Sequence, residues 1–212
     1  MKVYPKKKLI IGIDEVGRGS LAGPVCSVAS SLICSDFKKI QVETLSYVKD
    51  SKLLSANKRQ GIYKELINQK IIFGVGWASI EEISKYNILR ATILSMTRAF
   101  KKFTDNLSTN GMKFLVKIDG IHSPKNVKGP WDNWTLETET VKNGDSLVKE
   151  ISIASILAKV TRDTHMIQLD KKYPLYKFKK NMGYGTEEHI KILKKFGPCS
   201  CHRKTFSPIN KL

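Results

Sequence analysis

Acidic residues are scarce in this sequence, and four of them stand where they could share one chemical task. Asp14 and Glu15 follow the apolar run 8–13, Asp119 follows a second apolar run, and Asp145 comes after a third strand-like segment. Ligand sites in open α/β sheets lie beyond the carboxyl ends of strands, so we expect these side chains to converge. Converging carboxylates repel one another unless a cation compensates, and their oxygens suit hard divalent ions. The pattern predicts a Mg²⁺ or Mn²⁺ site, in which two ions would activate water against a phosphodiester.

A glycine–arginine–glycine triplet follows these acids at Gly17, Arg18 and Gly19. Glycine lets a backbone approach a ligand closely, and arginine binds phosphate with two parallel donors. By itself the triplet suits a turn with an exposed arginine, just as any single Asp after a strand is more often a turn or helix cap. Its position two residues beyond Glu15 favours a role beside the carboxylates.

The charge balance points to a polyanionic partner. The 212 residues contain 37 Lys and Arg against 19 Asp and Glu, a net charge of +18. Nucleic-acid phosphates are the commonest dense negative surface for such a protein, although a lysine-rich solvated surface is the alternative. Hydrophobic residues make up 41% of the chain, which excludes a disordered protein. A basic surface around an acidic metal site is typical of a nuclease.

Local patterns predict the elements that position these residues. Short apolar or alternating runs indicate strands over residues 8–13, 24–33, 71–78, 113–118 and 135–142. Helical spacing and caps indicate helices over 55–69, over 79–103 with a break near 86–87, over 146–172 and over 186–196. We therefore expect an α/β catalytic core over residues 1–170. The basic residues 171–212 are expected to form a helical extension packed on it.

Several segments exclude other classes of protein. No apolar run approaches the ~20 residues that a membrane span needs, and no export signal is recognisable, so we expect a cytoplasmic protein. The cysteines at positions 26, 34, 199 and 201 are then expected to be reduced thiols. The stretch 199–202 (C-S-C-H) is only a weak zinc signal, because no second ligand pair lies nearby. The role of this cysteine pair stays open.

At this point the motifs can be compared with a known family. The run 14–19 (D-E-V-G-R-G), followed by 21–25 (L-A-G-P-V), closely resembles the signature of type 2 ribonucleases H, the ribonuclease HII family. The resemblance extends along nearly the whole chain. Its further blocks, in order, are 50–55, 118–120, 144–146, 151–163, 183–189 and 202–208.

The resemblance implies a ribonuclease H-like fold, a mixed sheet flanked by helices with a C-terminal helical extension. The family's four active-site carboxylates match Asp14, Glu15, Asp119 and Asp145. They are expected to hold two divalent cations, Mg²⁺ or Mn²⁺, with Asp14 bridging the ions. The backbone of residues 17–19 is expected to contact 2′-hydroxyl groups, which distinguish RNA from DNA.

Other residues match substrate-binding positions of the family. Tyr184 corresponds to a tyrosine that stacks near the sugar at an RNA–DNA junction. Asp163 is expected to be a salt-bridge partner on its helix rather than a fifth ligand. Asn181 and Met182 stand where histidine and lysine are frequent, which puts the local grip on the DNA backbone in doubt. The candidates for phosphate contact are Lys52, Lys159 and Arg162.

The implied reaction is hydrolysis of the phosphodiester on the 5′ side of a ribonucleotide, leaving a 3′-hydroxyl and a 5′-phosphate. The substrates would be RNA–DNA hybrids and single ribonucleotides embedded in duplex DNA, so the enzyme would remove ribonucleotides from DNA. Family members imply a monomer, and no motif for a replication clamp is recognisable. The alternatives are a ribonuclease HIII-like activity and a non-catalytic basic RNA-binding protein.

Overall fold

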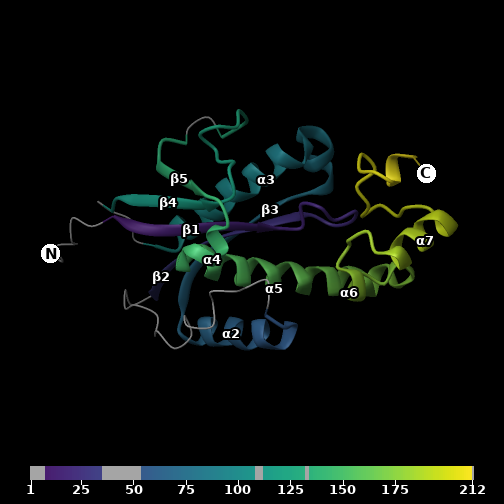
Figure 1. The fold of residues 1–212 in the computed structure, drawn as a ribbon, viewed down its shortest axis with the longest axis horizontal. Helices are drawn as coiled ribbons and strands as arrows, with labels where there is room; N and C mark the ends of the chain where they lie inside the picture. The colour runs from purple at the N-terminus through teal and green to yellow at the C-terminus, as the bar shows by residue number, and fades with distance from the viewer. Residues whose placement is uncertain (1–7, 35–53, 108–111, 132–133, 212) are drawn as a thin grey trace.

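The computed structural model describes residues 8–34, 54–107, 112–131 and 134–211 (Figure 1). Its centre is a mixed five-stranded sheet in the order β3-β2-β1-β4-β5. β2 pairs antiparallel with both β1 and β3, whereas β4 pairs parallel with β1 and β5. The strands are β1 (Leu9–Val16), β2 (Val25–Cys34), β3 (Ile71–Ala78), β4 (Phe114–Asp119) and β5 (Glu137–Val141).

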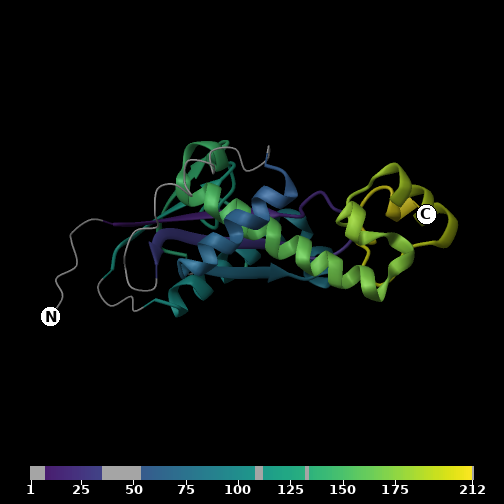
Figure 2. The ribbon, with the colours of Figure 1, turned by 90° about the horizontal axis from the view of Figure 1, so that it is seen from below.

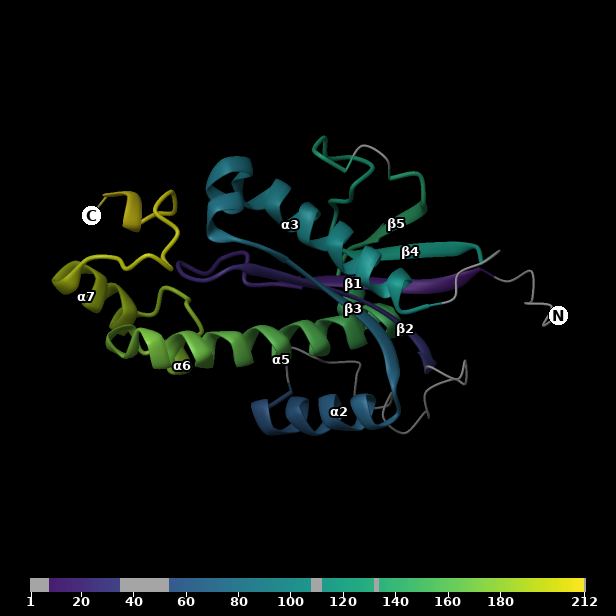
Figure 3. The same cartoon turned by 180° about the vertical axis from the view of Figure 1, so that it is seen from behind.

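Helices cover both faces of the sheet, which confirms the predicted α/β class. The long helix α3 (Ile80–Asp105) packs on one face, and α2 (Ala56–Asn68) and α5 (Lys149–Lys172) pack on the other (Figures 1 and 3). Each face has its own apolar core, one built with α3 and the other with α2 and α5. The remaining elements are α4 (Gly144–Leu147), η2 (Pro174–Tyr176), α6 (Phe178–Asn181), α7 (Glu187–Phe196) and η3 (Ile209–Lys211).

Helix starts follow the capping residues that the sequence indicates. The Ser79 hydroxyl accepts from the Glu82 amide while the Glu82 carboxylate accepts from the Ser79 amide, a complete capping box. Ser55 and Thr186 cap α2 and α7 in the same way with their hydroxyls. The predicted break in the second helix is confirmed at Asn87, whose φ is 65°.

The start of α5 approaches β1 closely at Gly12. A Cβ on this residue would lie 2.1 Å from the carbonyl carbon of Glu150, so only glycine lets the start of α5 lie directly on β1. This contact places the first half of α5 beneath the carboxyl end of β1.

The segment after α5 forms a small cluster at one end of the molecule, shown in yellow-green in Figure 2. Its core joins Phe178 and Leu193 to Met166 of α5 and to Leu21 from the turn after β1. The expected boundary at residue 170 falls within the last turn of α5, so one continuous helix connects the sheet with this cluster. None of the helices in the described residues has the length and the apolar character that a membrane span needs.

Candidate active site

Asp14 and Glu15 lie inside β1 rather than after it. The predicted strand ended at residue 13, but pairing with β2 continues from Asp14 opposite Val28 to Val16 opposite Cys26. Because neighbouring residues of a strand point to opposite faces, the two carboxylates leave the sheet on different sides. Asp14 is buried on the side of α5, where the Ser155 hydroxyl donates a hydrogen bond to it.

Asp119 and Asp145 lie at the same edge of the sheet. β1 and β4 are parallel with Ile13 opposite Ile118, so Asp119 is the strand neighbour of Asp14. The Asp119 carboxylate accepts a hydrogen bond of 2.7 Å from the amide of Gly144, the first residue of α4. Asp145 follows in α4 and is buried. The parallel strands β1, β4 and β5 thus bring all four predicted carboxylates to one edge of the sheet: two from β1, one from β4 and one from α4.

The electrostatics of this edge favour a cation. Burial and the charges of Glu15 and Asp119 raise the pKa of Asp14 well above its usual value. Burial also raises the pKa of Glu15, against the opposing effect of the Arg18 guanidinium 3.1 Å away. The second Glu15 oxygen, Oε2, is buried without a hydrogen-bond partner among the described residues. A buried anion without a partner is costly, so these residues fit a bound divalent cation.

A cleft of about 240 Å³ opens beside Glu15 and Asp119 and reaches the exposed Arg18. No three of the four carboxylates bring one oxygen each within 4.8 Å of one another in the described structure. The α3 side chains in the cleft wall are Leu89, Thr92, Ile93 and Met96.

The turn that follows β1 presents the glycine–arginine–glycine triplet. Gly17 has a φ of 90°, and a Cβ there would lie 2.1 Å from the Arg162 side chain, so this position requires glycine. Arg18 and Gly19 are exposed. A Cβ on Gly19 would have no atom within 4 Å, so the fold itself does not require glycine there.

The buried side chain of Arg203 holds this turn in place through hydrogen bonds to its carbonyl groups. Its guanidinium is 1% exposed and donates to the carbonyls of Gly17 at 2.7 Å, Arg18 at 2.8 Å and Gly23 at 2.9 Å. Burial and the charge of Arg162 lower the pKa of Arg203 to about 9, so the group remains charged at neutral pH. Arg203 lies in the block 202–208 that resembles the family, but no function was predicted for it. The surrounding sequence is basic and polar, so it gave no sign that this side chain is buried.

Arg162 has a similar position, which contradicts its predicted contact with phosphate. Its side chain is fully buried on α5, and its donors bind the Ser20 hydroxyl and the carbonyls of Ala22, Pro24 and Met182. No donor of this guanidinium is directed to solvent where a phosphate could reach it. Arg162 instead ties the turn after β1 to the loop before Tyr184.

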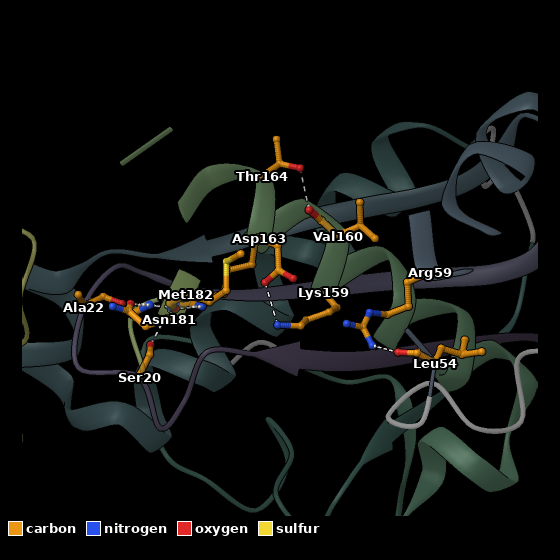
Figure 4. A network of polar contacts seen from close by, with 12 residues as sticks. Ser20, Ala22, Leu54, Arg59, Lys159, Val160, Asp163, Thr164, Asn181 and Met182 are labelled. Carbon is orange, nitrogen blue, oxygen red and sulfur yellow. Dashed lines mark hydrogen bonds and ion pairs between the residues drawn. The ribbon is translucent and has the colours of Figure 1, made fainter. Parts of the chain in front are cut away.

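Lys159 lies on the exposed side of the same helix. Its ammonium is 2.8 Å from the Asp163 carboxylate, so Asp163 is the salt-bridge partner that was predicted. Figure 4 shows this pair on α5, with Ser20 and Met182 close by. The Lys159 ammonium also lies 6.0 Å from the centre of the Tyr184 ring, which places both residues on one surface.

Tyr184 is half-buried and is held through its backbone. Its amide donates to the carbonyl of Asn181 at 2.9 Å, and its carbonyl lies 2.9 Å from Nδ1 of His189. The buried Asn181 side chain donates to the Tyr176 carbonyl and accepts from the Gly183 amide, so it shapes this loop instead of reaching DNA. Lys52 lies outside the described residues.

Comparisons with known proteins agree with this arrangement. The family profile described as Ribonuclease HII matches residues 11–209. A protein named Ribonuclease HII from Anaplasma phagocytophilum (strain HZ) is 43% identical over 203 residues, covering 96% of this chain and 88% of the relative. Another from Paraburkholderia xenovorans (strain LB400) is 41% identical over 201 residues, covering 95% of this chain and 73% of the relative.

Solved structures share the fold. Ribonuclease HII from Archaeoglobus fulgidus, in a complex with PCNA, superposes with a TM-score of 0.67 at 22% identity, covering 94% of this chain and 95% of that one. Bst-RNase HIII in complex with Mn²⁺ gives a TM-score of 0.71 at 18% identity, covering 96% of this chain and 68% of that one. The profile match, the sequence relatives and the carboxylate edge together lead to one conclusion: the chain belongs to the ribonuclease HII family and is an RNase H endoribonuclease.

Proposed function

We propose that this enzyme hydrolyses the phosphodiester on the 5′ side of a ribonucleotide, leaving a 3′-hydroxyl and a 5′-phosphate. Its substrates would be RNA–DNA hybrids and single ribonucleotides embedded in duplex DNA, so its role would be to remove ribonucleotides from DNA. The observation that carries the proposal is the exposed turn at Arg18 and Gly19, because Arg18 lines the same cleft as the carboxylates Glu15 and Asp119.

Asp14, Glu15, Asp119 and Asp145 would hold two divalent cations, Mg²⁺ or Mn²⁺. When bound, such ions activate a water molecule and offset the charge that develops on the leaving oxygen. The protein orients the ligands beforehand: the Glu15 amide donates to Asp14 at 2.7 Å, and the Gly144 amide donates to Asp119. The partnerless Oε2 of Glu15 supports a bound cation beside this residue.

Selection of a ribonucleotide would fall to the turn after β1. Arg203 draws the carbonyls of Gly17 and Arg18 inward. Arg18 and Gly19 are exposed residues, and their backbone amides donate to no backbone acceptor among the described residues. These amides are therefore available to a 2′-hydroxyl, the group that marks RNA. Tyr184 and Lys159 would contact the adjoining sugar and phosphate.

Gly19→Ala tests this assignment, and Gly61→Ala is the matched control. A Cβ would meet no atom within 4 Å at either position, so neither variant should lose more than about 1 kcal/mol of stability. On a DNA duplex with one ribonucleotide, Gly19→Ala should cleave at least about tenfold more slowly, because its methyl group occupies the space of the ribose. Gly61→Ala should cleave like the wild type. Wild-type cleavage by Gly19→Ala would refute the assignment of this turn.

The same substrate separates the competing functions. Cleavage at the 5′ side of the single ribonucleotide, only with Mg²⁺ or Mn²⁺ present, supports the proposal. Cleavage restricted to runs of several ribonucleotides would favour a ribonuclease HIII-like specificity. Binding without cleavage under every metal condition would favour a basic RNA-binding protein.

A further inference from the structure

Two cysteines and two histidines form a cluster in the C-terminal part, outside the carboxylate edge. The sulfur atoms of Cys199 and Cys201 are 3.0 Å apart, and the Cys199 sulfur is 3.1 Å from Nδ1 of His202. Nε2 of His202 is in turn 3.0 Å from Nε2 of His189. Cys201 and both imidazoles are buried, whereas Cys199 is half-buried and reachable from solvent.

The hydrogen bonds of the two histidines fix their protonation. Nδ1 of His202 accepts from the backbone amide of Cys199 at 3.0 Å, so the proton of a neutral ring is on Nε2. Nε2 then donates to His189, which leaves the proton of His189 on Nδ1, where it donates to the Tyr184 carbonyl. An unbroken chain of hydrogen bonds therefore runs from the cysteine pair to the loop that presents Tyr184.

Residues 201–203, which include the second cysteine of the cluster, are hydrogen-bonded to the turn after β1. The Cys201 carbonyl accepts from the Gly23 amide at 2.8 Å, and the Arg203 amide donates to the Leu21 carbonyl at 2.8 Å. Two residues beyond Cys201, the Arg203 guanidinium binds the Gly17 carbonyl. Hydrogen bonds therefore connect residues 199–203 with both parts of the proposed ribonucleotide-binding surface.

We propose that Cys199 and Cys201 are a dithiol site that peroxides oxidise to an intrachain disulfide, and that this oxidation slows cleavage. The effect on cleavage rests on the proposed function of residues 17–19 and Tyr184, whereas the oxidation itself does not. A structural zinc site is less favoured. Among the described residues, only His202 lies with the two thiols as a third ligand, and its Nδ1 lone pair already accepts the Cys199 amide.

One molecule of hydrogen peroxide is sufficient to oxidise both thiols to the disulfide. The Cys199 thiolate attacks a peroxide oxygen: an S–O bond forms, the O–O bond breaks, and hydroxide leaves and takes up a proton as water. The Cys201 thiol then loses its proton as its sulfur attacks Cys199: the S–S bond forms, the S–O bond breaks, and a second water leaves. Both sulfurs together lose two electrons, which reduce the peroxide. The hydrogen bond from the neighbouring Cys201 thiol supports the first step, since it is the main cause that lowers the pKa of Cys199 to about 5.

Disulfide formation would change the cluster geometry. The two sulfur atoms must approach from 3.0 Å to about 2.05 Å, and neither remains a thiol beside His202. The ring closes across one intervening residue, so the backbone of 199–201 must adjust. This adjustment would first disturb the hydrogen bond from the Gly23 amide to the Cys201 carbonyl.

The test uses the full chain and hydrogen peroxide. After oxidation and removal of peroxide, free thiols are blocked with N-ethylmaleimide, and the peptide with residues 199 and 201 is weighed by mass spectrometry. Cleavage of the single-ribonucleotide duplex is measured before oxidation, after it, and after reduction with dithiothreitol. Cys199→Ser removes the attacking thiolate, and Cys34→Ser is the control with a buried cysteine elsewhere.

We expect the wild type and Cys34→Ser to lose two hydrogen atoms in this peptide and about tenfold in cleavage rate, both restored by dithiothreitol. Cys199→Ser should keep its rate in peroxide. Both thiols remaining open to alkylation, or one equivalent of zinc bound to the purified protein at these thiols, would overturn the dithiol site. A disulfide without any change in cleavage, or equal inactivation of Cys199→Ser, would overturn the link to activity. If no preparation cleaves the duplex, the proposed function fails while the mass measurement still decides the dithiol site.

Discussion

Arg203→Lys should uncouple the turn after β1 from the rest of the protein while keeping the positive charge. The guanidinium reaches three carbonyls in different directions, those of Gly17, Arg18 and Gly23. A lysine ammonium is a compact charge on a flexible stem, so it cannot reproduce this planar fork. We expect it to satisfy one of the three carbonyls.

The magnitude follows from the bonds that are lost. A hydrogen bond to a charged group contributes about 1.5 kcal/mol, so the loss of two should lower the free energy of unfolding by about 3 kcal/mol. At roughly 2–4 °C per kcal/mol for a chain of this size, the melting temperature should fall by about 6–12 °C. Cleavage of the single-ribonucleotide duplex should fall by at least about tenfold, because residues 17–19 lose their support.

Urea unfolding followed by tryptophan fluorescence measures the stability change, and single-turnover cleavage measures the effect on the turn. Arg90→Lys is the control, because Arg90 is exposed and should change stability by less than about 0.5 kcal/mol. If Arg203→Lys unfolds at the wild-type urea concentration and cleaves at the wild-type rate, the proposed support of the turn by Arg203 is wrong.

Three further predictions use other parts of the structure. Asp119→Asn should lower the cleavage rate by at least about a thousandfold. It should also reduce the rise in melting temperature that Mn²⁺ causes in the wild type. If Mn²⁺ raises the melting temperature of the variant as much as that of the wild type, Asp119 is not a ligand of the metal. Gly12→Ala should cost more than about 3 kcal/mol in urea unfolding, because its Cβ would overlap the Glu150 carbonyl at 2.1 Å. Since the pKa of Cys199 is lowered to about 5, its thiolate predominates above that pH, and its alkylation by iodoacetamide should be nearly constant from about pH 6 to 8. A rate that rises steeply over this range would contradict the lowered pKa.

Much of the fold could be predicted because its signals are local. The limits 71–78 of the third strand, the capping box at Ser79 and the break at Asn87 all follow from residues a few positions apart. The end of β1 could not be found in this way. Acidic residues are unusual in a strand, and pairing with β2, which carries β1 on to Val16, is a tertiary contact.

In the candidate site, too, the features with local sequence signals were predictable, and those that depend on tertiary contacts were not. The order of Asp14, Glu15, Asp119 and Asp145 along strand-like runs was sufficient to expect one acidic edge. Burial of a basic residue was not predictable, because arginine is almost never fully buried unless its donors are satisfied. For Arg162 and Arg203 those partners are mostly backbone carbonyls, which carry no sequence signal.

The bond between Arg203 and Gly17 joins residues 186 positions apart in the chain. During synthesis on a ribosome, the sheet and every carboxylate emerge well before this arginine does. A nascent chain therefore carries the four carboxylates long before it carries the arginine that anchors the turn after β1. Loop-closure entropy grows slowly with length, so the delay is one of timing rather than of final stability. If this turn selects ribonucleotides as proposed, selectivity would be the last property that the folding chain acquires.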